Sequence, residues 1–124
     1  MPSPTSRALD VCRDKLGWTA CVVEKFNSFT KQRKDAFGFG DLLVCHPSVG
    51  CVLLQVTSGA NHASRETKIE SECATEAMAW IASGGGIQVW SFSKKGAAGK
   101  RKLWALRRSR AFVAGGRIGF SEIE

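Results

Sequence analysis

The sequence predicts an α/β fold in which a mixed β-sheet is flanked by helices. Apolar residues recur at helical spacing in two segments, and five short segments are rich in β-forming residues. In chain order these segments give α-β-β-β-α-β-β. With 124 residues the chain can bury one hydrophobic core, so we expect a single domain over residues 1–124.

The first expected elements are a helix over residues 3–17 and a strand over residues 18–26. Ser3 can cap the helix, Gly17 can end it, and three apolar residues share one stripe: Leu9, Cys12 and Leu16. The strand, WTACVVEKF, is rich in β-formers. Residues 31–35 then form an expected polar connection.

Two further strands are expected over residues 37–45 and 51–58. The first, FGFGDLLVC, contains two glycines that indicate a bend or a close approach of the backbone. Residues 46–50, HPSVG, have the composition of a turn. The two strands can therefore pair as a hairpin.

The second half of the expected fold is a helix followed by two strands. The helix covers residues 62–82, and its apolar face consists of Ile69, Cys73, Ala77, Trp80 and Ile81. The strands cover residues 87–93 and 103–109. Residues 94–102 between them, KKGAAGKRK, form a basic loop without apolar anchors.

Hydropathy narrows the classes of protein to which the chain can belong. No apolar run approaches the roughly 20 residues that span a bilayer, and the N-terminus lacks the apolar segment of a secretory signal. We therefore expect a soluble cytoplasmic protein with reduced cysteines in apolar surroundings. Its ends, residues 1–6 and about 114–124, are expected to be flexible.

Basic residues are concentrated toward the C-terminus. The chain has 18 Lys and Arg against 11 Asp and Glu, and residues 94–124 hold nine of the 18. This distribution favours a polyanion, most simply a nucleic-acid backbone; a solubilising surface is the alternative. The candidates for phosphate contacts are Arg65, Lys94, Lys95, Lys100, Arg101, Lys102, Arg107 and Arg108. Trp90 and Trp104 could stack on bases if exposed, and we expect at least one of them in the core.

Two polar residues interrupt the apolar strands. Asp41 opens the run LLVC, and Gln55 lies inside CVLLQVT. An unpartnered polar atom on a central strand costs roughly 1–3 kcal/mol, so each needs a partner or a function. Side chains alternate along a strand, so a hairpin would bring both to one surface. Their oxygens, with the backbone carbonyl of Val56, suit Mg²⁺ or Mn²⁺; the alternative is a turn Asp bonded to an interstrand amide.

The order of these motifs resembles the PD-(D/E)XK nuclease superfamily. The resemblance rests on VVEKF, then DAFGFGDLLV, then LLQVTSGANHASRETKIE, and spans residues 7–107. Within that superfamily the chain looks like small phage and bacterial members related to Holliday junction resolvases. The resemblance implies a restriction-endonuclease-like fold, Mg²⁺- or Mn²⁺-dependent cleavage of structured or branched DNA, and a bacterial cytoplasm. The related resolvases act as homodimers.

The match is position by position and has one departure. Asp41 matches the metal-binding Asp of the superfamily, and Gln55 matches its second acidic position, where Gln is a known variant. Thr57 stands where the superfamily has its lysine. A hydroxyl lacks the positive charge that would stabilise the phosphate being attacked.

Cations on the following helix could replace that charge. Lys68 is the expected catalytic residue, and Arg65, three positions earlier, supports it from the same helix face. The alternative for Lys68 is a surface ion pair with Glu72. Glu24 is a further catalytic candidate, because it is the only acidic residue of the first expected strand, although a solvent-facing position suits it equally. Asp35 is interpreted as a turn residue.

The sequence therefore favours a metal-dependent nuclease. Because Gln55 and Thr57 carry less charge than the superfamily's Glu and Lys, an inactive nucleic-acid-binding protein on the same fold is the alternative. A phage structural or host-interaction protein is a third interpretation, in which the basic loop binds a protein.

Overall fold

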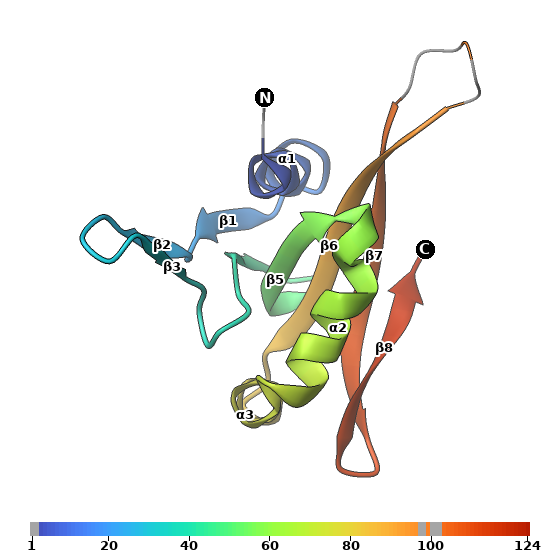
Figure 1. Cartoon of the computed structure of the whole chain (residues 1–124). Coiled ribbons are helices and arrows are strands. Elements are labelled where there is room, and N and C mark those ends of the chain that lie inside the picture. The colour runs from blue at the N-terminus through green and yellow to red at the C-terminus, as the bar shows by residue number, and fades with distance from the viewer. Residues whose placement is uncertain (1–2, 97–98, 100–102) are drawn as a thin grey trace.

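A mixed sheet of six strands forms the centre of the molecule (Figure 1). The computed structural model describes residues 3–96, 99 and 103–124. β5 and β6 run parallel, and the other neighbouring strands run antiparallel. In order across the sheet, the strands are β1 (Thr19–Val22), β4 (Leu42–His46), β5 (Gly50–Ser58), β6 (Gly86–Lys95), β7 (Leu103–Ala114) and β8 (Arg117–Ile123). The predicted α/β class with a mixed sheet is confirmed.

Helices cover both faces of this sheet. They are, in chain order, α1 (Pro4–Asp10), the π-helical turn η1 (Val11–Lys15), the 3₁₀ turn η2 (Gly59–Asn61), α2 (His62–Ser71) and α3 (Ala74–Ala82). A parallel pair of strands needs a crossover connection, and α2 and α3 form it between β5 and β6.

The alternation of side chains along β5 assigns its residues to two hydrophobic cores. Leu54 points to one face, where it packs with Cys12 of η1 and with Trp90. Leu53 points to the other face, where it packs with Ile69 of α2. Both leucines are at most 2% exposed, because β5 lies in the interior of the sheet.

The N-terminal helix begins as its sequence predicts. The N–H of Ser6 donates to Oγ of Ser3 at 3.1 Å, which satisfies a free donor of the first turn. Gly17 ends the helical segment with a positive φ of +68°, which a residue without Cβ adopts without strain. Residues 4–6, expected to be flexible, are part of α1.

The single helix predicted over residues 62–82 is in fact two helices. The N–H of Cys73 donates to the carbonyl of Lys68, five residues back, at 3.1 Å, and the chain changes direction there. Ile69 of α2 and Ala77 of α3 therefore both reach the same core. A straight helix would have carried α3 away from the sheet.

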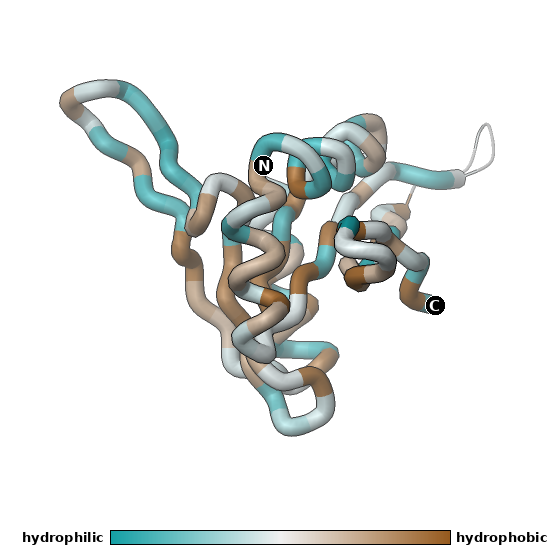
Figure 2. The backbone as a smooth tube through the Cα atoms, turned by 90° about the horizontal axis from the view of Figure 1, so that it is seen from below, coloured by the Kyte–Doolittle hydropathy of each residue, from teal (hydrophilic) through white to brown (hydrophobic). Residues whose placement is uncertain are grey.

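The strand predicted over residues 18–26 is also interrupted. β1 ends at Val22, and the chain then forms a separate two-stranded hairpin of β2 (Lys25–Asn27) and β3 (Gln32–Lys34). The prediction of a polar connection over residues 31–35 is therefore wrong. Figure 2 shows this β2–β3 hairpin projecting from the body as a largely hydrophilic arm with a hydrophobic position at its tip.

The strand predicted over residues 37–45 begins later, at Leu42. Phe37 and Gly38 have positive φ values of +55° and +86°, so the chain turns where an extended strand was expected. The turn buries Phe39 completely and leaves Phe37 55% exposed.

The C-terminal tail, expected to be flexible over residues 114–124, contains the edge strand β8. Gly115 and Gly116 both have positive φ values, +59° and +74°, as a tight two-residue hairpin turn requires. β8 then pairs with β7 along its length and places Ile118 in a core. The hydrophobic contacts of this strand explain why the tail folds.

Part of the basic loop, residues 97–98 and 100–102, lies outside the described residues. None of the helices in the described ranges has the length and hydrophobicity that crossing a membrane requires.

Candidate metal centre

Asp41 and Gln55 form the centre of the candidate site. Oδ2 of Asp41 accepts a hydrogen bond from Nε2 of Gln55 at 2.9 Å and another from the N–H of Val56 at 2.7 Å. Asp41 is 4% exposed and Gln55 3%. The register of the β4–β5 hairpin sets them opposite each other, because Leu42 pairs with Leu54. The prediction that the two polar residues share one surface is confirmed.

Two further carboxylates lie beside Asp41. Glu24 follows β1, Asp35 follows β3, and one oxygen of each lies within 4.8 Å of the others and of an Asp41 oxygen. The N–H of Val23 donates to the carbonyl of Asp41 at 3.0 Å, which holds the segment that carries Glu24 against β4. Glu24 is therefore at the site, as the sequence suggested. Asp35, interpreted as a turn residue, is also there, because the β2–β3 hairpin returns the chain to its starting point.

The electrostatics of this cluster favour a bound cation or proton. The pKa of Asp41 is raised to about 8; burial is the largest cause, the hydrogen bond from the N–H of Val56 opposes it, and the neighbouring carboxylates of Asp35 and Glu24 add to it. Carboxylates at such short distances cannot all be ionised without a counter-charge. The raised pKa of Asp41 therefore means that either a proton or a cation on this carboxylate relieves the unfavourable charge.

A pocket of about 400 Å³ opens over these residues. Its lining includes Asp41, Gln55, Val56 and Thr57 from the sheet and Arg65 from α2. Among the described residues, two buried side-chain atoms lack a hydrogen-bond partner, Oε1 of Gln55 and Nε of Arg65, and both belong to this pocket. A buried acceptor and a buried donor without protein partners cost stability unless water or a ligand completes them, and both of these atoms lie in the same pocket.

The sequence predicts that Lys68 and Arg65 both serve the site, but only Arg65 lines the pocket. Lys68 lies one turn later on α2. Thr57, at the position of the superfamily's lysine, is 6% exposed and also lines the pocket. A further cation, Arg33 of β3, lines the pocket and lies 3.9 Å from a carboxylate oxygen of Glu24. No sequence pattern pointed to Arg33, because its position depends on the β2–β3 hairpin.

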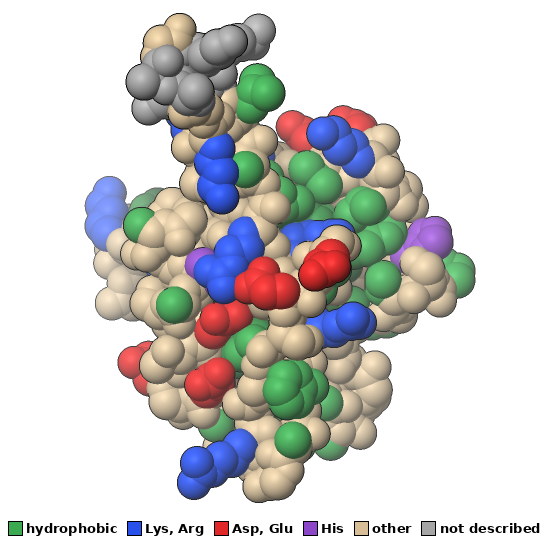
Figure 3. Space-filling model, turned by 90° about the vertical axis from the view of Figure 1, so that its right-hand side faces the viewer, with side chains coloured by type: hydrophobic (Ala, Val, Ile, Leu, Met, Phe, Trp, Pro, Cys, Tyr) green, Lys and Arg blue, Asp and Glu red, His purple; other side chains and the backbone are tan. Residues whose placement is uncertain are grey.

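The C-terminal basic residues form no continuous patch in the described structure. Figure 3 shows Lys and Arg side chains interspersed with acidic and hydrophobic ones on the face turned to the viewer. Arg107 donates through Nε to Glu122 at 2.8 Å, so its charge is paired. Arg108 lies over the ring of Trp90, with 5.6 Å between its Cζ and the ring centroid. Lys100, Arg101 and Lys102 lie outside the described residues.

The two tryptophans of this region divide as expected between core and surface. Trp90 is fully buried, and Trp104 is 43% exposed. Arg7 of α1 lies 3.9 Å from the centroid of the Trp104 ring, and Lys94 lies 5.3 Å from it. Trp104 therefore makes cation–π contacts with both side chains, and Arg7 already occupies one face of its ring.

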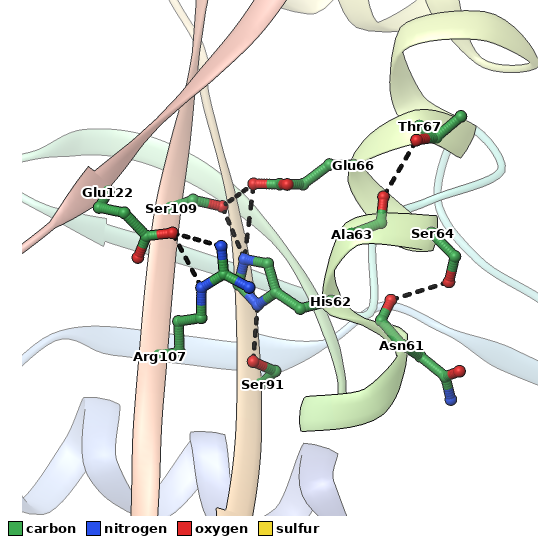
Figure 4. Close-up of polar contacts among 10 residues, drawn as sticks. All are labelled: Asn61, His62, Ala63, Ser64, Glu66, Thr67, Ser91, Arg107, Ser109 and Glu122. Atoms are coloured by element: carbon green, nitrogen blue, oxygen red, sulfur yellow. Dashed lines mark hydrogen bonds and ion pairs between the residues drawn. The ribbon is translucent and has the colours of Figure 1, made fainter.

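A second polar cluster, centred on His62, lies inside the protein (Figure 4). Its ring contacts Ser91 of β6 through Nδ1 at 2.6 Å and Ser109 of β7 through Nε2 at 2.9 Å. The hydroxyl of Ser109 donates a hydrogen bond to Glu66 at 2.6 Å, so Nε2–H of His62 donates to Ser109. In the neutral imidazole, Nδ1 then accepts a hydrogen bond from the hydroxyl of Ser91. A neutral imidazole satisfies every group of this cluster. Burial, the largest cause, and the positive charge of Arg107 lower the pKa of His62.

The His62 cluster is structural, although it contains a histidine, a serine and a carboxylate. His62, Ser91 and Ser109 are each at most 1% exposed, so no substrate reaches the hydroxyl groups. The cluster fastens the start of α2 to β6 and β7, and Arg65 follows His62 by three residues on that helix. It therefore fixes the position from which Arg65 enters the pocket. The sequence could not reveal this cluster, because its members are far apart along the chain.

The five cysteines are distributed over the molecule. Cys12 and Cys73 are buried, whereas Cys21, Cys45 and Cys51 are exposed, contrary to the expectation that most cysteines lie in apolar surroundings. All five are free thiols.

No family model matches the chain, and it matches no curated protein and no solved structure.

Proposed function

We propose that the chain is a metal-dependent nuclease that hydrolyses phosphodiester bonds, with DNA of structured or branched form as its substrate. The observation that carries this proposal is the unpartnered, buried Oε1 of Gln55 in a pocket that also holds the carboxylates of Glu24, Asp35 and Asp41. These are hard oxygen ligands, the kind that Mg²⁺ and Mn²⁺ prefer. The superfamily resemblance of the sequence agrees with this proposal, because it assigns the same two positions, Asp41 and Gln55, to the metal.

The residues of the pocket fit such an ion. Asp41 is held by two hydrogen bonds to one oxygen, which leaves its second oxygen for the cation. Gln55 is fixed by donating its amide to Asp41, so its carbonyl oxygen keeps a single orientation. The backbone carbonyl of Val56 remains the third proposed ligand. A bound divalent ion would supply an activated water and neutralise charge on the phosphate.

Arg65 is the residue we assign to the role of the missing lysine. Its Nε is buried and unpartnered in the pocket, and a guanidinium is permanently charged and well shaped for phosphate oxygens. It would stabilise the negative charge that develops on the phosphate during attack. Lys68 lies outside the pocket lining, so we assign it no contact with the reacting groups.

A cleavage assay with matched variants tests the proposal. Labelled plasmid, linear, flap and four-way DNA are incubated with Mg²⁺, Mn²⁺ or EDTA. We expect cleavage that requires the ion and that Asp41→Asn abolishes, because the asparagine retains an oxygen for the hydrogen bonds of Gln55 and Val56 but loses the charge. Ion-independent breakdown, or equal cleavage by Asp41→Asn, would show that a contaminating nuclease acts.

A second candidate function is nucleic-acid binding without catalysis. It is favoured by Thr57, which lies in the pocket without a positive charge. Salt-sensitive DNA binding with no cleavage in any ion would select this function over the first.

A further inference from the structure

The β2–β3 hairpin projects from the edge of the metal pocket. Its two strands pair only with each other, and every residue from Lys25 to Lys34 is exposed. Glu24 immediately precedes the hairpin and Asp35 immediately follows it, and both belong to the carboxylate cluster. Figures 1 and 2 show the arm extending away from the sheet and its helices. Whatever binds at the pocket therefore lies at the base of this arm.

The tip of the hairpin carries an unusually exposed aromatic side chain. Phe29 is 96% exposed, and Phe26 on β2 is 61% exposed. Oδ1 of Asn27 accepts hydrogen bonds from the N–H groups of Phe29, at 2.9 Å, and Thr30, at 3.3 Å. This turn fixes the backbone at the tip, so Phe29 is held outward from an ordered turn. An isolated two-stranded hairpin has little stability of its own, and an apolar ring at its end adds none, which indicates a binding role.

The charges of the hairpin identify the kind of partner. Four cations, Lys25, Lys31, Arg33 and Lys34, accompany the two phenylalanines, and no acidic residue lies between positions 25 and 34. Phosphates attract such cations, and bases stack on aromatic rings. A shallow pocket of about 690 Å³ runs along the arm and is lined by Lys25, Phe26, Phe29 and Lys34 among others, a size within the usual range for ligand sites.

We propose that the β2–β3 hairpin is a wedge that stacks Phe29 on an unpaired or unstacked base while its cations bind the flanking phosphates. This inference deepens the proposed function and rests on it for the position of the cleaved bond. It names the substrate class as nucleic acid with bases that are unpaired or easily unpaired. Phe29 lies five residues beyond Glu24, and a strand rises about 3.3 Å per residue, so the tip reaches at most about 17 Å from the cluster. That distance corresponds to about five base-pair steps of 3.4 Å along a strand.

Binding measurements in EDTA test the wedge separately from cleavage. The probes are a matched DNA duplex and the same duplex with a three-nucleotide bulge that contains 2-aminopurine, whose fluorescence reports stacking. We expect the parent protein to prefer the bulged DNA. Phe29→Ala should weaken binding to the bulged DNA roughly 5- to 100-fold, the range for loss of one stacked base, and should leave the matched duplex nearly unaffected. Because Phe29 is 96% exposed, the substitution removes no packing.

Phe112→Ala is the matched control, because Phe112 is 45% exposed on the distant strand β7. It should keep the preference for the bulge and the fluorescence change. Retention of both by Phe29→Ala would overturn the wedge. So would Phe29-dependent binding to phosphatidylglycerol vesicles without a preference among DNAs, because the arm would then be a membrane-binding element. Cleavage in Mg²⁺ is scored separately, so a protein that prefers the bulge but never cleaves refutes the nuclease and retains the wedge.

Discussion

Binding of Mn²⁺ at the Asp41 cluster is expected to strengthen about 50-fold when the pH rises from 6 to 8. The perturbation is the pH alone, with the protein and the ion unchanged. Burial raises the pKa of Asp41 to about 8, and a bound cation must displace the proton that this group holds. With that pKa, about one site in a hundred is deprotonated at pH 6 and about half are at pH 8, and their ratio gives the expected gain.

Titration calorimetry at pH 6, 7 and 8 measures this gain. Repeating each titration in two buffers of different ionisation enthalpy counts the protons released. We expect about one proton per ion at pH 6 and about half a proton at pH 8. Asp41→Asn is the control, because its amide cannot titrate; it should bind the ion weakly and with the same affinity at every pH.

An affinity that is equal at pH 6 and pH 8, with no protons released, would refute the reasoning. It would mean that the ion binds away from Asp41, or that the carboxylate is already ionised in the ion-free protein. The stability of the ion-free protein gives a second check. Its contribution from Asp41 should fall with rising pH, whereas the affinity for Mn²⁺ should rise. The raised pKa of Asp41 means that the folded state keeps a proton that the unfolded state has lost, so the contribution of Asp41 to stability, measured as the difference between the parent and Asp41→Asn, falls as the pH rises from about 4 to about 8.

Four further predictions concern the cations of α2, the His62 cluster, the pH dependence of His62 and the lysines at the end of β6. Arg65→Ala should lower the rate of DNA cleavage about 100-fold or more, whereas Lys68→Ala should change it only a few fold, with Mn²⁺ calorimetry unchanged for both; equal losses would return Lys68 to the site. His62→Ala should cost about 2–4 kcal/mol in urea unfolding, because it opens a cavity, leaves the buried hydroxyl of Ser91 without its partner and removes one of the two hydrogen bonds of Ser109. The lowered pKa of His62 also predicts that the parent loses stability as the pH falls below about 6.5, a dependence that His62→Gln should lack; an identical pH profile in both would place the titrating group elsewhere. Replacing Lys94 and Lys95 by alanine should flatten the log–log salt dependence of duplex binding by up to about two units, and an unaltered slope would exclude both residues from the DNA interface.

The centre of the site could be predicted from local sequence patterns. Asp41 and Gln55 are related by a short antiparallel hairpin, whose register follows from the turn and from side-chain alternation. Asp41 and Gln55 occupy facing positions of this hairpin, so its register alone predicts that their side chains lie together. The order of the main strands and helices was predicted in the same way, because each has a clear hydrophobic period.

The surroundings of the site could not be predicted in this way. Asp35 reaches the carboxylate cluster only because the β2–β3 hairpin closes, and its strands, all exposed, show no burial pattern. The choice between Arg65 and Lys68 depends on the orientation of α2, which is set by contacts of His62 with strands far along the chain. Helical spacing shows only that Arg65 and Lys68 are neighbours on one face of α2, and it does not show which of them reaches the pocket.

The edge strand β8 has a clear signal in the sequence, although the tail was expected to be flexible. Gly115 and Gly116 form a two-residue glycine turn, and Ile118 and Phe120 follow at alternate positions. This combination is typical of a hairpin. Proximity to the C-terminus was a poor reason to expect disorder there, because β7 offers a long partner.

The β2–β3 hairpin leaves and re-enters the body of the protein at almost the same point, since Glu24 and Asp35 bring carboxylate oxygens within 4.8 Å of each other. The intervening ten residues are all exposed and lie outside both hydrophobic cores. Exchange, shortening or lengthening of this segment therefore costs the rest of the fold little, because the closure entropy of a loop changes slowly with its length. The arm is consequently an interchangeable part: a designer could replace it with another segment and test whether the proposed recognition changes while the carboxylates of Glu24, Asp35 and Asp41 stay together at its base.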